Sequence, residues 1–302
     1  MRIVALRALG LGDLLTAVPA LRALRRAYPD AHLSLAAPAW LAPMVTLLDC
    51  IDELVDTAPL SPLAPRLHGA DLAVNLHGQG PQSTELLRAS SPERLLSYGV
   101  GPVWRDGERE AARWCRLLQE SGIPADPDDL RVVPPTGLPV EAGAVLVHVG
   151  SAAASRRWPL ERWAQVVRAL PGRVRLTAGP GEEQVAREVA RQAGLTDQQV
   201  LQELSLPALT RLVAASRLLV APDTGVAHLA TAVGTPSVVL FGPVPPQVWG
   251  APPSWRQHRA LWAGVESDNH GAGTAPGMLL LTPAQVLEAC VQVLAISATG
   301  PG

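Results

Sequence analysis

The sequence contains no lysine: all 25 residues counted as lysine or arginine are arginines, in a chain of 302 residues. An enzyme that forms a Schiff base needs a lysine amine, and a Walker-type phosphate loop needs a lysine beside the phosphates. Both classes of protein are therefore excluded. Arginine stays charged and binds phosphate through a planar, two-pronged guanidinium group, so arginine is the cation available here for phosphate binding.

Cysteines and long apolar runs are also scarce. The few cysteines lie far apart, at Cys50, Cys115 and Cys290, which indicates neither a disulfide framework nor a zinc site. No secretory segment or membrane-spanning apolar run occurs, and the richest apolar region, residues 33–48, is interrupted by prolines. The net charge of −2 argues against general nucleic-acid binding. We expect a soluble cytoplasmic protein without a nucleic-acid partner.

Apolar segments rich in branched residues alternate with helical patterns, which predicts an α/β fold with parallel sheets. Strands are expected near residues 3–6, 32–36, 72–76, 144–149, 174–177, 219–221 and 237–241. The proline-rich segment 134–139 indicates a stiff linker between two domains, residues 1–136 and 143–302.

The end of the chain contains two segments without a regular pattern. Residues 243–253 are rich in proline and are expected to be loop, and residues 267–274 are expected to be flexible. The last helix is expected near residues 283–295, and it could pack back on the first domain.

The most informative segment is residues 218–230, a buried strand that Pro222 ends. Asp223 and Thr224 are good helix N-caps, and Gly225 precedes a helical run. Because the first turn of a helix has unpaired N–H groups, such a corner suits an anion such as a diphosphate. His228, about one turn along, could face the same anion. The alternative is an ordinary strand–turn–helix corner with a satisfied core histidine.

A second corner of this type opens the chain. A short apolar strand is followed by a loop with Gly10 and Gly12, and Asp13 then begins a helix. The dinucleotide-binding fingerprint would need a third glycine at Leu15, so a nicotinamide or flavin cofactor is not expected. The corner instead delivers a carboxylate to the edge of a sheet, although Asp13 could simply stabilise the helix dipole.

Three segments together resemble the heptosyltransferases of glycosyltransferase family nine, in matching order. They are Gly10–Asp13 with Pro19, Ser155–Trp163 and Asp223–Ala230. Residues 71–78 and 179–183 also resemble that family, so that the resemblance covers about residues 1–245. It implies a GT-B fold, in which an N-terminal acceptor-side Rossmann-like domain and a C-terminal nucleotide-sugar-binding one face a central cleft. The implied co-substrate is a nucleotide sugar, ADP-heptose by family likeness, with no further cofactor.

The resemblance also implies roles for individual residues. Asp13 would be the general base, Asp223 would hold sugar hydroxyls, and Arg156 would take the place of a phosphate-binding lysine. The other candidates for nucleotide-sugar binding are Ser151 at a strand end, Glu182, Leu204, Thr224, Gly225 and His228. The candidates on the acceptor side are Gly12, His77 and Gln79. His77 and Gln79 follow a strand end, and they could equally be ordinary surface-loop residues. Trp158 and Trp163 are expected to be core residues rather than sugar platforms.

Many glycosyltransferases hold a divalent metal with an Asp-x-Asp pair. The pair Asp126–Asp128 follows a turn in an expected surface loop, where carboxylates are usually solvated. We therefore expect no metal site, and a metal-independent, inverting transfer to a glycan or lipopolysaccharide-type acceptor. That acceptor would bring at most peripheral contact with the inner face of the cell membrane. Two alternatives remain, a nucleotide-sugar epimerase or hydrolase on the same scaffold, and a non-catalytic sugar-nucleotide binding protein.

Overall fold

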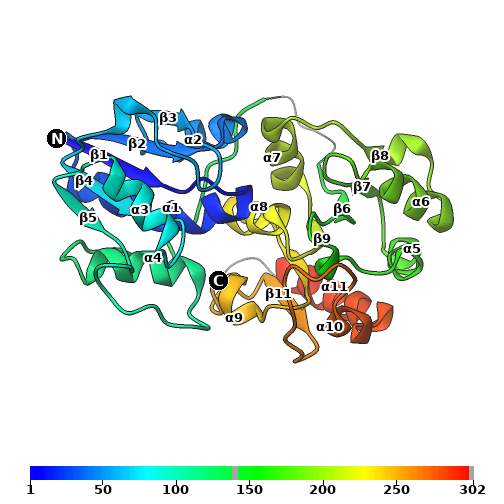
Figure 1. The fold of residues 1–302 in the computed structure, drawn as a ribbon. Coiled ribbons are helices and arrows are strands. Elements are labelled where there is room, and N and C mark those ends of the chain that lie inside the picture. The colour runs from blue at the N-terminus through cyan, green and yellow to red at the C-terminus, as the bar shows by residue number, and fades with distance from the viewer. Residues whose placement is uncertain (138–141, 299–302) are drawn as a thin grey trace. The chain divides into compact units, whose positions relative to one another are not determined.

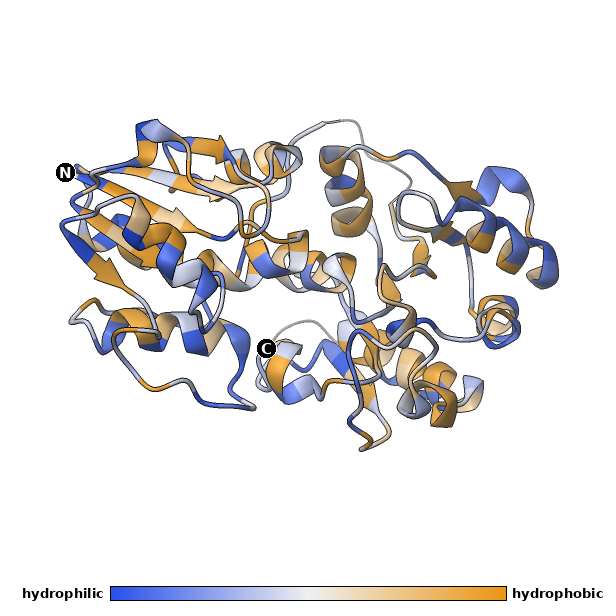
Figure 2. Ribbon diagram, viewed as in Figure 1, coloured by the Kyte–Doolittle hydropathy of each residue, from blue (hydrophilic) through white to orange (hydrophobic). Residues whose placement is uncertain are grey.

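The structure is a computed structural model that describes residues 1–137 and 142–298. The chain folds into two compact units, residues 1–133 and 134–302. Residues 138 and 139 of the expected linker lie outside the described residues. Figure 2 shows that apolar residues are concentrated in the strands of each unit, as buried parallel strands require.

The first unit is built on a five-stranded parallel sheet with the order β3-β2-β1-β4-β5 (Figure 1). Its strands are β1 (Arg2–Leu6), β2 (His32–Ala37), β3 (Glu53–Asp56), β4 (Leu72–Asn75) and β5 (Arg94–Leu96). Its α-helices are α1 (Leu11–Ala27), α2 (Ala42–Leu48), α3 (Gln82–Ala89) and α4 (Glu110–Gln119), and its 3₁₀ turns are η1 (Ala39–Leu41) and η2 (Pro65–Leu67).

The second unit is built on a six-stranded parallel sheet with the order β11-β10-β9-β6-β7-β8. Its strands are β6 (Val145–His148), β7 (Val174–Thr177), β8 (Val200–Leu201), β9 (Leu218–Pro222), β10 (Ser237–Phe241) and β11 (His258–Trp262). Its α-helices are α5 (Leu160–Ala169), α6 (Glu183–Ala193), α7 (Leu206–Ala215), α8 (Gly225–Val233), α9 (Pro246–Trp249), α10 (Pro276–Leu280) and α11 (Pro283–Ala298). Two 3₁₀ turns, η3 (Ala154–Arg156) and η4 (Asp197–Gln199), complete it.

Helices cover both faces of the second sheet. Along β10, Val238 and Leu240 belong to the main core together with residues of α11. Val239 and Phe241 instead contact Ala227 of α8. Because successive side chains of a strand point to opposite faces, α8 and α11 lie on opposite sides of the sheet. The same main core contains Trp158 and Trp163, packed edge to face with their ring centroids 4.9 Å apart, which confirms that they are core residues.

All the expected strands form, and the strands that the sequence analysis missed are β3, β5, β8 and β11. These four are the edge strands of the two sheets. An edge strand is short and partly exposed, so it lacks the continuous apolar run by which the central strands were found.

Two expected boundaries were wrong. Residues 243–253 are not all loop, because α9 forms within them with a proline in its first turn, where the missing N–H costs nothing. Helix α1 begins at Leu11 rather than at Asp13, and Asp13 is its third residue. There the Asp13 carboxylate accepts a hydrogen bond from the Gly10 N–H at 3.1 Å, which caps the helix.

The order of the strands fixes where each unit gathers its loops. In the first sheet the chain leaves β1 toward β2 and later returns to β4 on the other side of β1. In the second sheet it leaves β6 toward β7 and returns to β9 on the other side of β6. At such a reversal the loops diverge and leave a crevice at the carboxyl ends of the strands. The ends of β1 and β4, and those of β6 and β9, are therefore the places to look for ligands.

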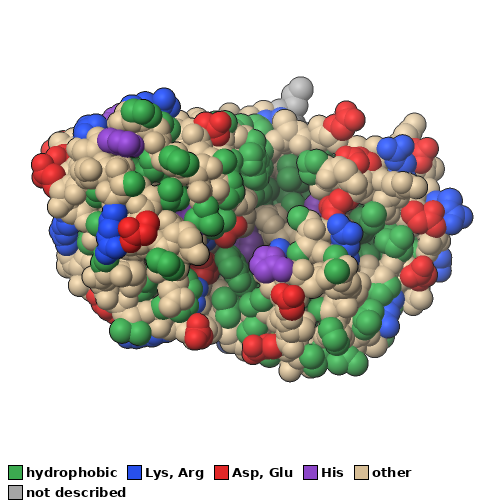
Figure 3. Space-filling model, in the orientation of Figure 1, with side chains coloured by type: hydrophobic (Ala, Val, Ile, Leu, Met, Phe, Trp, Pro, Cys, Tyr) green, Lys and Arg blue, Asp and Glu red, His purple; other side chains and the backbone are tan. Residues whose placement is uncertain are grey.

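The surface gives no sign of one dominant charge. On the face shown in Figure 3, arginines and acidic side chains are interspersed. None of the helices within the described ranges is both long enough and apolar enough to span a membrane.

Candidate functional site

Two loops meet at the carboxyl ends of β6 and β9. The loop after β6 carries Arg156 in η3, and the loop after β9 begins with Asp223, which is buried. Nη1 of Arg156 donates a hydrogen bond to the backbone oxygen of Asp223 at 2.9 Å and lies 3.8 Å from its carboxylate. These contacts bring together two of the residues that the sequence singled out.

Helix α8 starts at this point with its first turn open. Thr224 is the N-cap residue, but its side chain makes no capping hydrogen bond. The N–H groups of Ala227 and His228 bond to the backbone oxygen of Thr224 at 3.0 and 3.3 Å. The N–H groups nearest the helix start have no intrahelical partner, so they need a ligand or water. His228 itself packs beside Asp223, with Nε2 3.7 Å from the carboxylate.

Several buried polar atoms around this corner have no hydrogen-bond partner within the described residues. They are Ser151 Oγ, Arg156 Nε, Thr224 Oγ1 and Asn269 Oδ1. Buried polar groups are nearly always hydrogen-bonded in folded proteins, so a cluster of unsatisfied ones indicates a place where a polar ligand or water binds. The two hydroxyls, the guanidinium and the amide could together hold a phosphate or a sugar.

Asn269 was missed by the sequence analysis. It lies in the segment 267–274, which contains no helix or strand. Ser155 holds this segment beside Arg156, because its hydroxyl donates to the backbone oxygen of Asn269 at 2.6 Å and its own backbone oxygen accepts from Ala275 at 3.0 Å. No local pattern announces such a contact between residues 114 positions apart.

Glu182 links the loops that follow β6 and β7. Its carboxylate accepts hydrogen bonds from the N–H groups of Ser151 at 2.9 Å and Gly179 at 3.1 Å. Gly150 allows this approach, since a Cβ there would lie 1.9 Å from a Glu182 oxygen. In this conformation Glu182 shapes the site. Leu204 is half-buried between β8 and α7.

The first unit has its own polar cluster, at the carboxyl ends of β1 and β4. Arg7, which is 1% exposed, donates from Nε to the backbone oxygen of Asp13 at 2.9 Å. Its Nη2 lies 3.3 Å from the Asp13 carboxylate and 3.1 Å from that of Glu110. Its Nη1 reaches the backbone oxygen of Leu76, just after β4. Arg7 thus holds the carboxylate of Asp13 at the sheet edge, and the sequence analysis had not identified it.

His77 belongs to the same cluster. Burial lowers its pKa, the charge of Arg7 lowers it further, and the charge of Asp13 raises it. Its Nδ1 is buried without a hydrogen-bond partner within the described residues. Gly12 lies in the first turn of α1, next to Asp13. Gln79 is exposed, and no hydrogen bond or ion pair in the described part of the chain ties it to Asp13.

Both members of the Asp-x-Asp pair contact other groups of the first unit. Asp128 forms an ion pair with Arg109, and its N–H donates to the Asp126 carboxylate at 3.0 Å. Across residues 1–137 and 142–298, no three or more His, Cys, Asp or Glu side chains form a group suited to a metal ion.

The fold defines an α/β protein with two parallel sheets, each with a polar cluster at a strand reversal. Residues 126–271 match the model of the family "Glycosyltransferase family 9 (heptosyltransferase)". Lipopolysaccharide heptosyltransferase 1 of Escherichia coli K12 is 33% identical over 121 residues, which are 38% of this chain and 37% of that protein. The aligned part thus spans little more than a third of this relative. Residues 126–271 are thus similar to glycosyltransferase family 9, and the resemblance inferred from the motifs is confirmed.

Solved structures match along the whole chain. A family 9 glycosyltransferase from Veillonella parvula superimposes with a TM-score of 0.81 at 21% identity, covering 98% of this chain and 97% of that one. The E. coli ADP-heptose lipopolysaccharide heptosyltransferase II gives a TM-score of 0.77 at 18% identity, covering 99% and 100%. At such identities the likeness establishes the fold, and it confirms the expected GT-B type.

His148, the last residue of β6 in the sheet of the second unit, is a buried histidine. His148 Nδ1 lies 3.1 Å from the Thr177 hydroxyl at the end of β7. Burial lowers the pKa of His148 from 6.5 to about 4, because the charged imidazolium would lose its hydration. In the unfolded chain the same side chain takes up its proton near the ordinary pKa.

We predict that this histidine makes the protein sensitive to acid. As the pH falls from 6.5 to about 4, the unfolded chain binds a proton at residue 148 and the folded chain does not, so the free energy of unfolding falls. The contribution lost reaches roughly 3 kcal/mol. Urea unfolding of wild type and His148→Gln at several pH values measures it, and the variant should lose less stability over this interval. Equal losses in the two proteins would contradict the prediction.

Proposed function

We propose that this protein is an inverting, metal-independent glycosyltransferase that moves heptose from ADP-heptose to a glycan or lipopolysaccharide-type acceptor. The observation that carries the proposal is the corner between β6 and β9. There Arg156 contacts Asp223, and several buried polar atoms have no hydrogen-bond partner within the described residues. The names of the matching proteins supply the sugar, the nucleotide and the acceptor class. An acceptor of that class would keep the enzyme in the cytoplasm, with at most peripheral contact with the inner face of the membrane.

The second unit binds the donor in this proposal. The first turn of α8 offers the N–H groups near Thr224 and Gly225 to the diphosphate, and Gly225 has no side chain to obstruct it. Arg156 adds the positive charge. Asp223 and His228 lie on the sugar side, while Ser151, Glu182 and Leu204 surround the nucleoside. The negative charge that grows on the departing diphosphate is thus met by an arginine and a helix N-terminus, without a metal ion.

The first unit supplies the base. The acceptor hydroxyl attacks the anomeric carbon while its proton passes to the Asp13 carboxylate. The bond from the anomeric carbon to the phosphate oxygen breaks, and its electron pair leaves with the diphosphate. One displacement of this kind inverts the configuration of the sugar. Arg7 holds Asp13 in place through contacts to both its backbone and its carboxylate. Gly12, His77 and Gln79 would line the acceptor side.

A nucleotide-sugar hydrolase is the second candidate. It is favoured by His77, whose unpartnered buried Nδ1 near Asp13 could orient a water molecule. A hydrolase releases free heptose in the absence of acceptor, whereas a transferase consumes the donor only when acceptor is added. Product analysis with and without acceptor separates the two.

The first test concerns the base. Asp13→Asn keeps the size and the capping oxygen of the side chain but removes the basic carboxylate, so turnover should fall by about 10²–10⁴-fold. Binding of ADP-heptose should be unchanged by calorimetry. Asp126→Asn, in the exposed loop, serves as the matched control and should behave as wild type. Turnover by Asp13→Asn at the wild-type rate would remove Asp13 from the mechanism.

The second test concerns the phosphates. Arg156→Ala should weaken ADP binding by about 1.5–3 kcal/mol, the usual contribution of a charged hydrogen bond. Arg156→Lys keeps the charge and should retain much of the affinity. Arg187→Ala, on the exposed face of α6, is the control. If calorimetry gives Arg156→Ala the wild-type affinity for ADP, the nucleotide binds elsewhere.

The third test concerns the metal. Because Arg156 and α8 neutralise the leaving group, transfer should continue in excess chelator, and Asp128→Ala should change the rate by less than about twofold. A rate that falls on chelation and returns with magnesium or manganese would contradict this part of the mechanism.

A further inference from the structure

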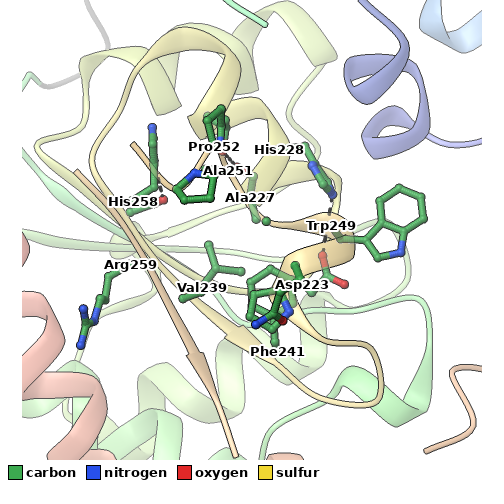
Figure 4. Close-up of a pocket in the computed structure, with 17 residues that line it drawn as sticks. Asp223, Ala227, His228, Val239, Phe241, Trp249, Ala251, Pro252, His258 and Arg259 are labelled. Carbon is green, nitrogen blue, oxygen red and sulfur yellow. Dashed lines mark hydrogen bonds and ion pairs between the residues drawn. The ribbon is translucent and has the colours of Figure 1, made fainter. Parts of the chain in front are cut away.

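The second unit contains a pocket beside the corner between β6 and β9, where the donor is proposed to bind (Figure 4). The pocket has a volume of about 220 Å³. One wall comes from α8, through Ala227, His228 and Thr231, which share a helix face. The floor comes from alternate residues along the whole of β10, from Ser237 through Val239 to Phe241. The third side is formed by β11 and by α9 with the residues that follow it.

The pocket opens at the corner described above. Asp223 and His228 both line it, and His228 lies edge to face with Trp249 of α9, with ring centroids 5.8 Å apart. In Figure 4 Asp223, His228 and Trp249 lie together at one end, with His258 toward the other. Because Asp223 lines the pocket and its backbone oxygen accepts from Arg156, the pocket lies beside the proposed diphosphate site.

The lining of the pocket combines apolar and polar groups. Val239, Phe241 and Pro252 give apolar surface, and Trp249 adds an indole ring. Gln247 brings an amide that can bond hydroxyls. Sugars present apolar C–H faces between hydroxyl groups, and such a mixture suits them. A phosphate at the end of the pocket that Asp223 lines would be repelled by the carboxylate of Asp223. An uncharged group such as a sugar therefore fits that end better.

We propose that this pocket receives the part of the donor sugar that is remote from the anomeric carbon, and that Gln247 and Trp249 decide which sugar is accepted. The inference rests on the proposed function, because it needs the diphosphate at α8. The volume lies below the roughly 300–1,000 Å³ of pockets that hold larger ligands, so it suits a single sugar with its exocyclic carbons rather than the whole nucleotide sugar. The nucleoside then lies outside the pocket, toward Ser151 and Glu182.

The experiment fills the pocket and compares two ligands. Ala260→Trp adds bulk from β11 at an exposed position that lines the pocket, so the core is left intact. Ala295→Trp, at an exposed position on α11, is the matched control. By calorimetry, Ala260→Trp should bind ADP like wild type but lose about tenfold or more in affinity for ADP-heptose. The control should bind both ligands like wild type.

Gln247→Ala, at an exposed position on α9, provides a second variant that removes a hydroxyl partner without adding bulk. It should also weaken ADP-heptose selectively. If both variants bind ADP-heptose as wild type does, or lose ADP and ADP-heptose equally, the pocket does not hold the sugar and the proposal is overturned. If the wild-type protein binds neither ligand, the proposed function fails, and the pocket proposal fails with it.

Discussion

The buried guanidinium of Arg7 is the group around which the first unit is organised. It joins the end of β1, the end of β4, the start of α1 and the carboxylate of Glu110 on α4. Removing one partner of a buried ion pair costs about 3–5 kcal/mol, because the other charge is left unpaired. Glu110 also forms an ion pair with Arg113, and its carboxylate accepts a hydrogen bond from the Trp114 indole at 3.0 Å. Asp13 is more exposed than Glu110, and the contacts of Arg7 with its backbone and its carboxylate fix its position.

The polar cluster of the second unit differs in one physical respect. The N–H groups of Arg7 donate hydrogen bonds to other groups of the protein, as those of a structural arginine do. Arg156 is partly exposed and bonds a backbone oxygen, while its Nε is buried without a partner in the described residues. A network with unsatisfied members is costly unless something completes it. In the proposed mechanism this contrast fits a positioning role for Arg7 and a ligand-binding role for Arg156, although both are arginines at a sheet edge.

The sequence predicted the central strands and both glycine-containing corners, because each corner is local, although it placed the start of α1 at Asp13 instead of Leu11. Pro222, Asp223 and Gly225 are neighbours in sequence, and their spacing alone indicates the end of a strand and the start of a helix. The partners that complete the clusters could not be found in this way. Glu110 contacts Arg7 across 103 positions, and no periodic pattern marks a loop residue such as Asn269. Long-range polar contacts depend on the tertiary fold, which a local pattern does not encode.

The absence of lysine gives the corner between β6 and β9 a particular geometry. A lysine ammonium has three donors on one nitrogen, so the Asp223 backbone oxygen and a phosphate would both have to lie around that single atom. The guanidinium of Arg156 separates these tasks, because Nη1 holds the strand end while Nε remains to be satisfied. The planar group is also fixed in orientation by its first bond, so less conformational entropy is lost when the second forms. At this position an arginine can therefore be part of the scaffold and a ligand-binding group at once.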